Sequence, residues 1–370
     1  MTLIRPFKGW IASNAHCGRV PIKHIDSYSS DAIEEELSSN PYSFLQVLAP
    51  SIHSSSELDL KERFALVRER LFEQLFSGVY RELSQESLWI YQIKSARINA
   101  TGVVGITPIS AYVNQTVKRH EQTKAARRDT LAVYLDEVGI HADPVVLAFS
   151  DNKDRFKSWC CSFTASCPPS VDLTLGQEVH KLWQLTDPKH IEEIQSLIES
   201  NKSTYIVDGH HRIESSLHYA NSKHEVQGDA DLAYFMSFFI AEDDLNIQAV
   251  AKPFTVSFSA QECLKRLNSY ASFEHCDLEV TSEEHSLQIN HDNYLIRLHK
   301  NASLADLEHC LNNLPQATST SDSVTALLLR PKAYTVYDLK QAAESEIPMA
   351  AKSTYIEPKL LTGLLIYPIA

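Results

Sequence analysis

The sequence predicts an α/β protein in which helices are combined with mixed sheets (α+β). Helix-type and strand-type segments alternate along most of the chain, and no internal repeat or low-complexity tract interrupts them. With 370 residues, 44% of them hydrophobic, the chain is long enough for two or three lobes, each with a buried core. This composition excludes a disordered chain, a disulfide-stabilised miniprotein and a fibrous repeat.

The first third contains one predicted helix and two predicted strands. Between Glu57 and Phe76, apolar residues recur at steps of three and four, which is typical of one face of an amphipathic helix that ends near Gly78. The stretches Leu88–Ile93 and Gly102–Val113 are rich in β-branched and aromatic residues and are therefore predicted to be paired strands.

The middle of the chain alternates helices and strands. A helix is expected over Arg128–Val138 because Gly139 can end it in a left-handed conformation, and Asp187-Pro188 is typical of a helix start. The Ser, Pro and Cys content of Asp151–Gly176 predicts an insertion or a long loop. The other elements expected here are strands Pro144–Phe149, Val179–Leu185 and Thr204–Val207, and a helix from Pro188 to about Ser200.

The last part of the chain continues this mixture. Thr318–Ser323 is predicted to be a hinge or surface loop. The expected helices are Gly209 to Ala220, Ala260–Tyr270 and Ser303–Leu314, and the expected strands are Leu232–Ile240, Tyr294–Leu298, Ala326–Leu329 and Leu364–Tyr367. We divide the chain into an N-terminal α/β lobe (1–115), a central region (116–258) and a C-terminal α/β lobe (259–370) that packs back on the core.

Charge and composition exclude several function classes. The net charge of -13 disfavours nonspecific nucleic-acid binding, and no apolar run reaches the ~18 residues of a membrane span. We therefore expect a cytoplasmic protein that binds neither nucleic acid nor a membrane. The ten glycines form no Rossmann fingerprint, Walker A loop or nucleophile elbow. Seven cysteines without a C-x-x-C pair predict reduced thiols rather than disulfides or a zinc knuckle.

The segment Tyr205–Arg212 has the most specific pattern in the chain. An apolar strand stops at Asp208 and Gly209, and a helix then opens with His210, His211 and Arg212. Backbone N–H groups at such a turn, together with Arg and His side chains, can bind a phosphate, and Asp208 could hold Mg²⁺ or take a proton. An aspartate N-cap on an exposed helix is the structural alternative. A site of Asp208, His210 and Glu214 for a metal such as zinc is a further alternative.

Two other segments carry candidate residues. His120-Glu121-Gln122-Thr123 lies in a cation-rich window that ends at Arg128; these cations could hold polyphosphate, and Glu121 or His120 could act as general base. A solvated turn is the alternative for this window. Near the C-terminus, Lys352-Ser353-Thr354 offers one cation and two hydroxyls to an anion, although chemistry alone predicts a loop.

Together these segments resemble a bacterial and archaeal domain-of-unknown-function family with the motifs H-E-x-T, W-x-[IL]-T-D-P, Y-I-A-D-G-H-H-R and M-P-x-K-S-T-x-F-x-P-K. The matching segments here are Ile4–Phe7, Asn40–Tyr42, His120–Thr123, Leu182–Pro188, Tyr205–Arg212 and Met349–Lys359. The chain departs from the family at Val20–Asp26, where only Asp26 matches an A-P-P-Y-D stretch, at Asp129-Thr130 and at Ala251–Phe254.

The D-G-H-H-R motif in turn is similar to D-G-H-T-R of free-serine kinases and, more distantly, to loops of ParB and sulfiredoxin. The resemblance implies a ParB/sulfiredoxin-like core in the central region, with additional α/β lobes. It also implies that Asp208, Gly209, His210, His211 and Arg212 handle nucleotide phosphates. His210 stands where sulfiredoxin has its reactive cysteine, so sulfinic-acid repair is not expected.

These patterns lead to the hypothesis of a nucleotide-dependent small-molecule phosphotransferase, such as a kinase for the hydroxyl of free serine. Mg²⁺ with ATP or ADP would be bound at Asp208, Glu121 would take the proton of the hydroxyl, and Lys352 would neutralise developing charge. Catalytic roles are assigned to Glu121, Asp208, His210 and Lys352; phosphate binding is assigned to Gly209, His211, Arg212, His120, Thr123, Arg128, Ser353 and Thr354. The alternative is a non-catalytic regulator that binds a nucleotide or phosphometabolite.

Overall fold

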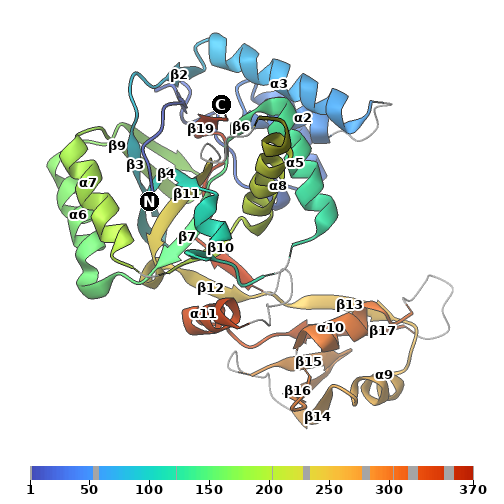
Figure 1. Ribbon diagram of the computed structural model, residues 1–370. Coiled ribbons are helices and arrows are strands. Elements are labelled where there is room, and N and C mark those ends of the chain that lie inside the picture. Colours follow the sequence, from blue (N-terminus) through green and yellow to red (C-terminus); the bar gives the residue numbers. More distant parts are fainter. Residues whose placement is uncertain are drawn as a thin grey trace. The chain divides into compact units, whose positions relative to one another are not determined.

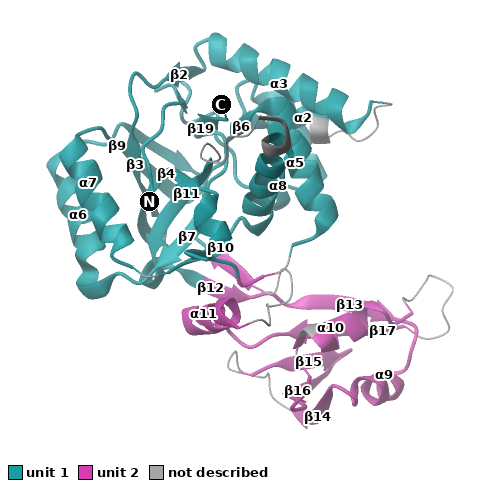
Figure 2. Ribbon diagram, viewed as in Figure 1, with its two compact units in different colours: residues 1–119, 123–246, 357–370 teal, residues 120–122, 247–356 magenta. Residues whose placement is uncertain are grey.

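The computed structural model describes residues 2–52, 58–121, 123–201, 203–227, 234–276, 284–302, 304–315, 324–345 and 354–369. These residues form two compact units (Figure 2). Unit 1 consists of residues 1–119, 123–246 and 357–370, and unit 2 of residues 120–122 and 247–356. This partition differs from the three predicted lobes because strands from the first and the middle part of the chain share one sheet.

An eight-stranded mixed sheet is the centre of unit 1 among the described residues (Figure 1). Its strand order is β5-β10-β7-β11-β4-β3-β9-β8. The bounds are β3 (Leu88–Lys94), β4 (Asn99–Pro108), β5 (Val117–Lys118), β7 (Val145–Phe149), β8 (Val171–Leu175), β9 (Glu178–Leu185), β10 (Thr204–Asp208) and β11 (Tyr234–Ala241). The pairs β5–β10 and β7–β11 are parallel and the others are antiparallel, which confirms the predicted mixed α/β class.

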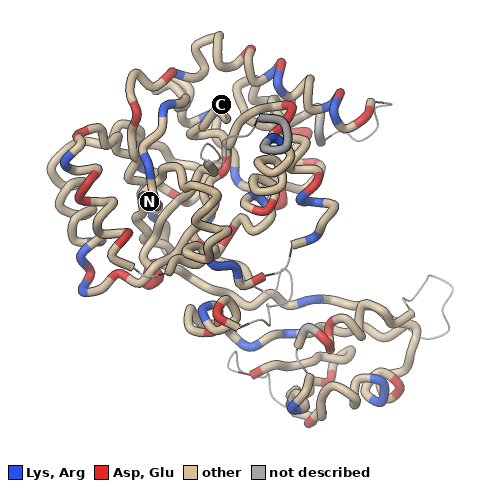
Figure 3. Tube along the Cα trace, viewed as in Figure 1, with Lys and Arg blue, Asp and Glu red and all other residues tan. Residues whose placement is uncertain are grey.

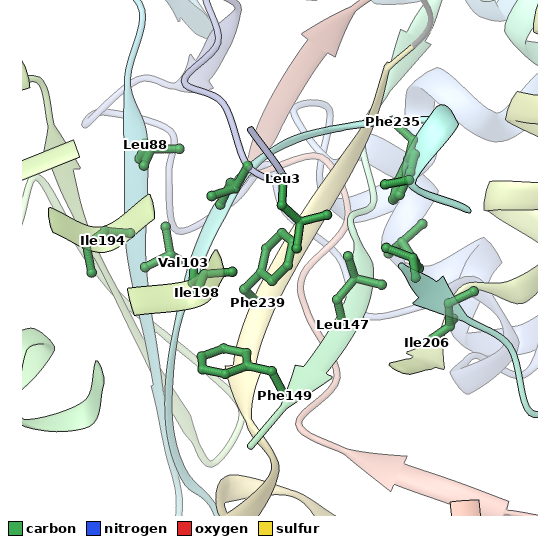
Figure 4. Packing of buried hydrophobic residues seen from close by; sticks show 14 of the residues in the cluster. Leu3, Leu88, Val103, Leu147, Phe149, Ile194, Ile198, Ile206, Phe235 and Phe239 are labelled. Carbon is green, nitrogen blue, oxygen red and sulfur yellow. The ribbon is translucent and has the colours of Figure 1, made fainter. Parts of the chain in front are cut away.

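Helices cover both faces of this sheet, so its strands are buried on either side (Figure 1). Helices α6 (Arg155–Ser166) and α7 (Pro188–Glu199) pack on one face, and α5 (Ala125–Val138) and α8 (His210–Gln227) lie on the other. Ile194 and Ile198 of α7 pack near Val103, Phe149 and Phe239 of the sheet (Figure 4). Unit 1 also contains α1 (Ser30–Ser39), α2 (Phe44–Ile52), α3 (Leu60–Phe76), α4 (Ser110–Val113), and the 3₁₀ turns η1 (Ile25–Ser27), η2 (Asn152–Asp154) and η3 (Glu242–Asp244).

A second sheet of unit 1 joins distant parts of the chain. It has the order β2-β1-β19-β6, with bounds β1 (Trp10–Ala12), β2 (Tyr80–Glu82), β6 (Ile140–His141) and β19 (Leu365–Pro368). Because β19 pairs with both β1 and β6, the C-terminal segment is fixed within unit 1.

Unit 2 contains a five-stranded antiparallel sheet among the residues described, in the order β13-β17-β15-β16-β14. Leu267, Leu307, Leu311 and Leu329 belong to its own hydrophobic core. Its elements are β12 (Asn246–Ala249), β13 (Lys252–Val256), α9 (Ala260–Leu267), β14 (Ala271–Cys276), β15 (Ser286–Ile289), β16 (Asp292–Leu298), α10 (Leu304–Asn312), β17 (Thr325–Arg330), α11 (Val336–Glu344) and β18 (Thr354–Glu357). Acidic and basic residues are interspersed along the traces of both units (Figure 3).

Most predicted elements are confirmed, including the pairing of the first two strands and the end of α5 at Gly139, whose φ is +73°. The predicted loop over Asp151–Gly176 is wrong, because α6 and β8 form there. The Asp151 carboxylate accepts hydrogen bonds from the N–H groups of Phe156 and Lys157 at 2.9 and 3.0 Å, which stabilises the first turn of α6. The strand expected to reach Val113 stops at Pro108, and the loop expected at Thr318–Ser323 lies outside the described residues.

Candidate functional site

The D-G-H-H-R motif forms a strand, a tight turn and a helix, as its sequence predicts. Strand β10 ends at Asp208, Gly209 adopts a φ of +97°, and α8 begins at His210. The carbonyl of Gly209 accepts the N–H groups of Arg212 at 2.9 Å and Ile213 at 3.1 Å, which closes the first turn of the helix. A residue other than glycine would be strained at this φ.

The Arg212 side chain folds back over Gly209 and pairs with two carboxylates. Its Nη2 pairs with Asp208 Oδ2, and its Nη1 pairs with Asp143 Oδ2. A Cβ atom on Gly209 would lie only 2.8 Å from Arg212 Nε, so a side chain there would displace the guanidinium. The turn therefore requires glycine for two reasons, its backbone conformation and its contact with Arg212.

Asp143 was not among the residues that the sequence singled out. It lies between β6 and β7, and β7 runs antiparallel to β10 with Val146 opposite Asp208. This pairing brings the start of β7 to the end of β10, where Arg212 can reach it. An acid directly before Pro144 and a buried strand was the available sequence signal, but it is too common to identify a site.

Lys359 enters the same cluster from the C-terminal motif. Its Nζ donates to Asp208 Oδ1, so this carboxylate has one cation on each oxygen. The segment that carries Lys359 is anchored, since Thr362 forms a bridge with Ile22 and the N–H of Gly363 donates to the carbonyl of Ala142 at 2.9 Å. We call Asp143, Arg212, Asp208 and Lys359 the charge cluster.

The charge cluster changes the titration of its members. Burial alone would raise the pKa of Asp208, but Arg212 and Lys359, with a smaller effect of His24, hold it far below its usual range. Burial opposes the positive charge of Arg212, whereas Asp143 and Asp208 outweigh it and raise the pKa of the guanidinium. Asp208 and Arg212 are therefore both ionised at neutral pH.

Three histidines lie near the turn or its neighbours. His210, the first residue of α8, is buried, and His211 is half-buried. His141, close in sequence to Asp143, is buried and stacks on Tyr367 with ring centroids 5.9 Å apart. Burial and the positive charge of Arg212 lower the pKa of His141 to about 4, so it is neutral at physiological pH.

The H-E-x-T segment directly follows β5, which runs parallel to β10. Val117 and Lys118 pair with Thr204 and Tyr205, so both strands end at the same edge of the sheet. Arg119, the residue before the motif, binds Glu214 of α8 at 2.8 Å. This ion pair connects the residue before H-E-x-T to α8, the helix that begins within D-G-H-H-R.

The remaining predicted site residues divide between the units. His120, which is buried, and Glu121 group with unit 2, whereas Thr123 belongs to unit 1. Arg128 is in α5 and binds Asp129 through Nε at 2.8 Å. Lys352 and Ser353 lie outside the described residues, and Thr354 is the first residue of β18.

A magnesium ion does not fit Asp208 in this arrangement, because both of its oxygens are already engaged by cations. The alternative site of Asp208, His210 and Glu214 does not fit either, since Glu214 binds Arg119 and Tyr112. Across the part of the chain that the structure describes, no group of three or more His, Cys, Asp or Glu residues is placed to hold a metal ion.

The family of the chain follows from a sequence comparison. A family model described as a protein of unknown function, DUF1015, matches residues 4–347. The chain belongs to the DUF1015 family. This confirms the resemblance that the motifs indicated, and both D-G-H-H-R and H-E-x-T lie inside the matched range. No curated protein matches this DUF1015 chain.

Several solved structures are similar to it in fold. C-terminally truncated SbnI from Staphylococcus aureus is 9% identical, with a TM-score of 0.42 over 72% of this chain and 87% of that one. A free serine kinase mutant in complex with ADP is 12% identical, with a TM-score of 0.41 over 75% and 94%. A conserved hypothetical protein from Pyrococcus furiosus is 11% identical, with a TM-score of 0.36 over 70% and 95%.

Within the described residues, no helix is long and apolar enough to cross a membrane. The charge cluster lies in unit 1, at the end of strand β10.

Proposed function

We propose that this DUF1015 chain is a phosphotransferase that uses ATP or ADP to phosphorylate the hydroxyl group of a small metabolite, such as free serine. The observation that carries this proposal is the charge cluster at the start of α8. Two cations, Arg212 and Lys359, are brought to the N-terminus of a helix by segments far apart in the sequence. A helix N-terminus favours anions, and Arg and Lys side chains can add charge-assisted hydrogen bonds to a phosphate that binds there.

Arg212 can bind phosphate while it stays paired within the cluster. A guanidinium has five N–H donors, so its contacts with Asp143 and Asp208 leave further donors for phosphate oxygens. The carboxylates hold the cations in fixed orientations, which reduces the entropy lost when a ligand binds. His210 and His211, at the helix start, complete the proposed phosphate-binding loop.

In the proposed transfer, the hydroxyl oxygen of the acceptor forms a bond to the terminal phosphorus and the bond between that phosphorus and the leaving nucleotide oxygen breaks. The hydroxyl proton passes to a general base, the role that the sequence motif proposes for Glu121. Arg212 and Lys359 would stabilise negative charge on the transferred group and the leaving oxygen. Lys352, Thr123, Arg128, Ser353 and Thr354 remain proposed contacts of phosphate. Magnesium would enter on the nucleotide.

A binding and turnover experiment tests this proposal. We expect ATP or ADP to raise the melting temperature of the purified protein, because a ligand at 100 times its Kd stabilises the folded state by about 2.7 kcal/mol. Phosphorus NMR with free serine added should then show a new phosphomonoester signal. If neither nucleotide binds the folded protein, the proposal is wrong.

Two variants separate the roles of the loop and the base. Arg212→Lys keeps the charge but loses the planar fork, so nucleotide affinity should fall at least about tenfold. Arg266→Lys, in an exposed pair with Glu262 on α9, is the matched control and should leave affinity unchanged. Glu121→Gln should keep affinity and lose turnover. Binding without turnover by the unmodified chain would instead support the non-catalytic regulator.

A further inference from the structure

The carboxylate of Asp208 is saturated by cations that belong to the protein itself. Oδ1 accepts from the Lys359 ammonium and Oδ2 pairs with the Arg212 guanidinium. In the phosphate-binding loop of the proposed function, an aspartate at the end of a strand is the residue type that would hold Mg²⁺. In this protein the Lys359 ammonium lies beside Asp208, where a metal ion would otherwise supply the positive charge.

We infer that Lys359 acts as a tethered cation in place of a protein-bound metal ion at Asp208, so that the loop binds nucleotide phosphates without a divalent ion held by the protein. The part of this inference that concerns nucleotide binding rests on the proposed function. The part that concerns metal binding by Asp208 stands on the geometry alone.

Electrostatics supports this assignment. The charge cluster contains two carboxylates and two cations, and Asp143 and Asp208 are both bound to the same guanidinium. A divalent ion at Asp208 would be placed beside two positive groups and would have to displace one of them.

The fold holds Lys359 in place rather than leaving it on a free tail. Leu360 and Leu361, which follow it, are 5% and 3% exposed, and the bridge between Thr362 and Ile22 fixes the next residue. Strand β19 then pairs with β1 and β6. Since the backbone on the C-terminal side of Lys359 is fixed, the ammonium can reach Asp208 with little further loss of conformational entropy.

The first test measures metal binding without nucleotide. Electron paramagnetic resonance with Mn²⁺ as the probe is measured on the unmodified full chain and on Asp208→Asn. The two proteins should give the same manganese binding, because Asp208 binds no metal ion. Manganese binding that the Asp208→Asn variant abolishes would overturn the inference. This measurement needs no Lys359 variant and therefore does not depend on whether such a variant folds.

The second test measures ADP affinity by calorimetry in buffer with Mg²⁺ and in buffer with EDTA. The ADP affinity of the unmodified chain should differ by no more than about twofold between the two buffers. The affinity of Lys359→Met should be at least about tenfold lower in EDTA and should recover with Mg²⁺. Lys359→Arg keeps a tethered cation and should behave like the unmodified chain. Lys8→Met removes an exposed lysine paired with Glu82 at 3.6 Å and is the control.

The outcomes distinguish the two proposals. ADP binding by the unmodified chain that requires Mg²⁺, with no change in Lys359→Met, would overturn the tethered cation and leave the proposed function intact. If neither ADP nor ATP binds any folded variant in either buffer, the proposed function is overturned, and the manganese measurement still decides whether Asp208 is a metal ligand.

Discussion

The guanidinium of Arg212 is paired with the carboxylate of Asp143, which reaches it from the turn between β6 and β7. Both side chains are largely buried, at 16% and 21% exposure. The pair connects the D-G-H-H-R loop to a segment that contains no motif. It also fixes the guanidinium over Gly209, which makes Asp143 a positioning residue for the proposed phosphate-binding loop.

Asp143→Asn should destabilise the protein by about 1–3 kcal/mol, because it removes one carboxylate from a largely buried guanidinium. Urea unfolding followed by circular dichroism measures the change in the free energy of unfolding. Asp172→Asn is the control, since its pair with Lys181 is more exposed and should contribute less than about 1 kcal/mol. Equal effects of the two substitutions would contradict the positioning role.

Gly209→Ala should cost more stability than Gly139→Ala. Both glycines have positive φ, +97° and +73°, so each alanine introduces backbone strain of about 1–3 kcal/mol. Only at Gly209 would the added Cβ also meet Arg212 Nε, at 2.8 Å, whereas nothing lies within 4 Å at Gly139. The difference in melting temperature between the variants measures that contact. No difference would show that Arg212 moves away at little cost.

The charge cluster should stabilise the fold at neutral pH and lose this contribution in acid. The pKa of Asp208 is lower in the folded chain than the unfolded value of about 3.9, so the contribution is full above about pH 4 and declines below it. Chemical denaturation at neutral pH and at about pH 3 should therefore show a larger deficit for Asp208→Asn at neutral pH. The same deficit at both pH values would contradict the ionised cluster.

His180 should make the protein less stable as the pH falls from about 6.5 to 4. It is fully buried, and burial together with the charge of Lys23 lowers its pKa to about 4, while its Nδ1 is hydrogen-bonded to the Tyr91 hydroxyl at 3.0 Å. The unfolded chain takes up this proton first, so stability is greatest above the unfolded pKa and declines below it.

The His180→Gln variant should show a smaller slope of unfolding free energy against pH in that window. His218→Gln, which changes a histidine with a side chain 52% exposed, should leave the slope as it is. Parallel slopes for all three proteins would mean that other groups cause the acid sensitivity.

Local features of this protein were predictable from its sequence. Three such features depend only on residues close in the chain. They are the apolar spacing of three and four residues in α3, the end of α5 at Gly139 and the strand–glycine–helix pattern around Gly209. The family motifs were visible for the same reason. The loop predicted over Asp151–Gly176 failed because serines, prolines and cysteines suggested polar surface, whereas Phe156 and Cys160 face the core of unit 1.

Only the tertiary structure decided which charges meet. Asp143, Asp208 and Lys359 come from three distant segments, and their approach depends on the pairing of β7 with β10 and of β19 with β6. Nothing local to Asp143 distinguishes it from other acids, because an ion pair depends on distance in space and on shared burial. The sequence thus determined the strand–glycine–helix turn and the local pair of Asp208 with Arg212, and the sheet pairings determined that Asp143 and Lys359 reach that pair.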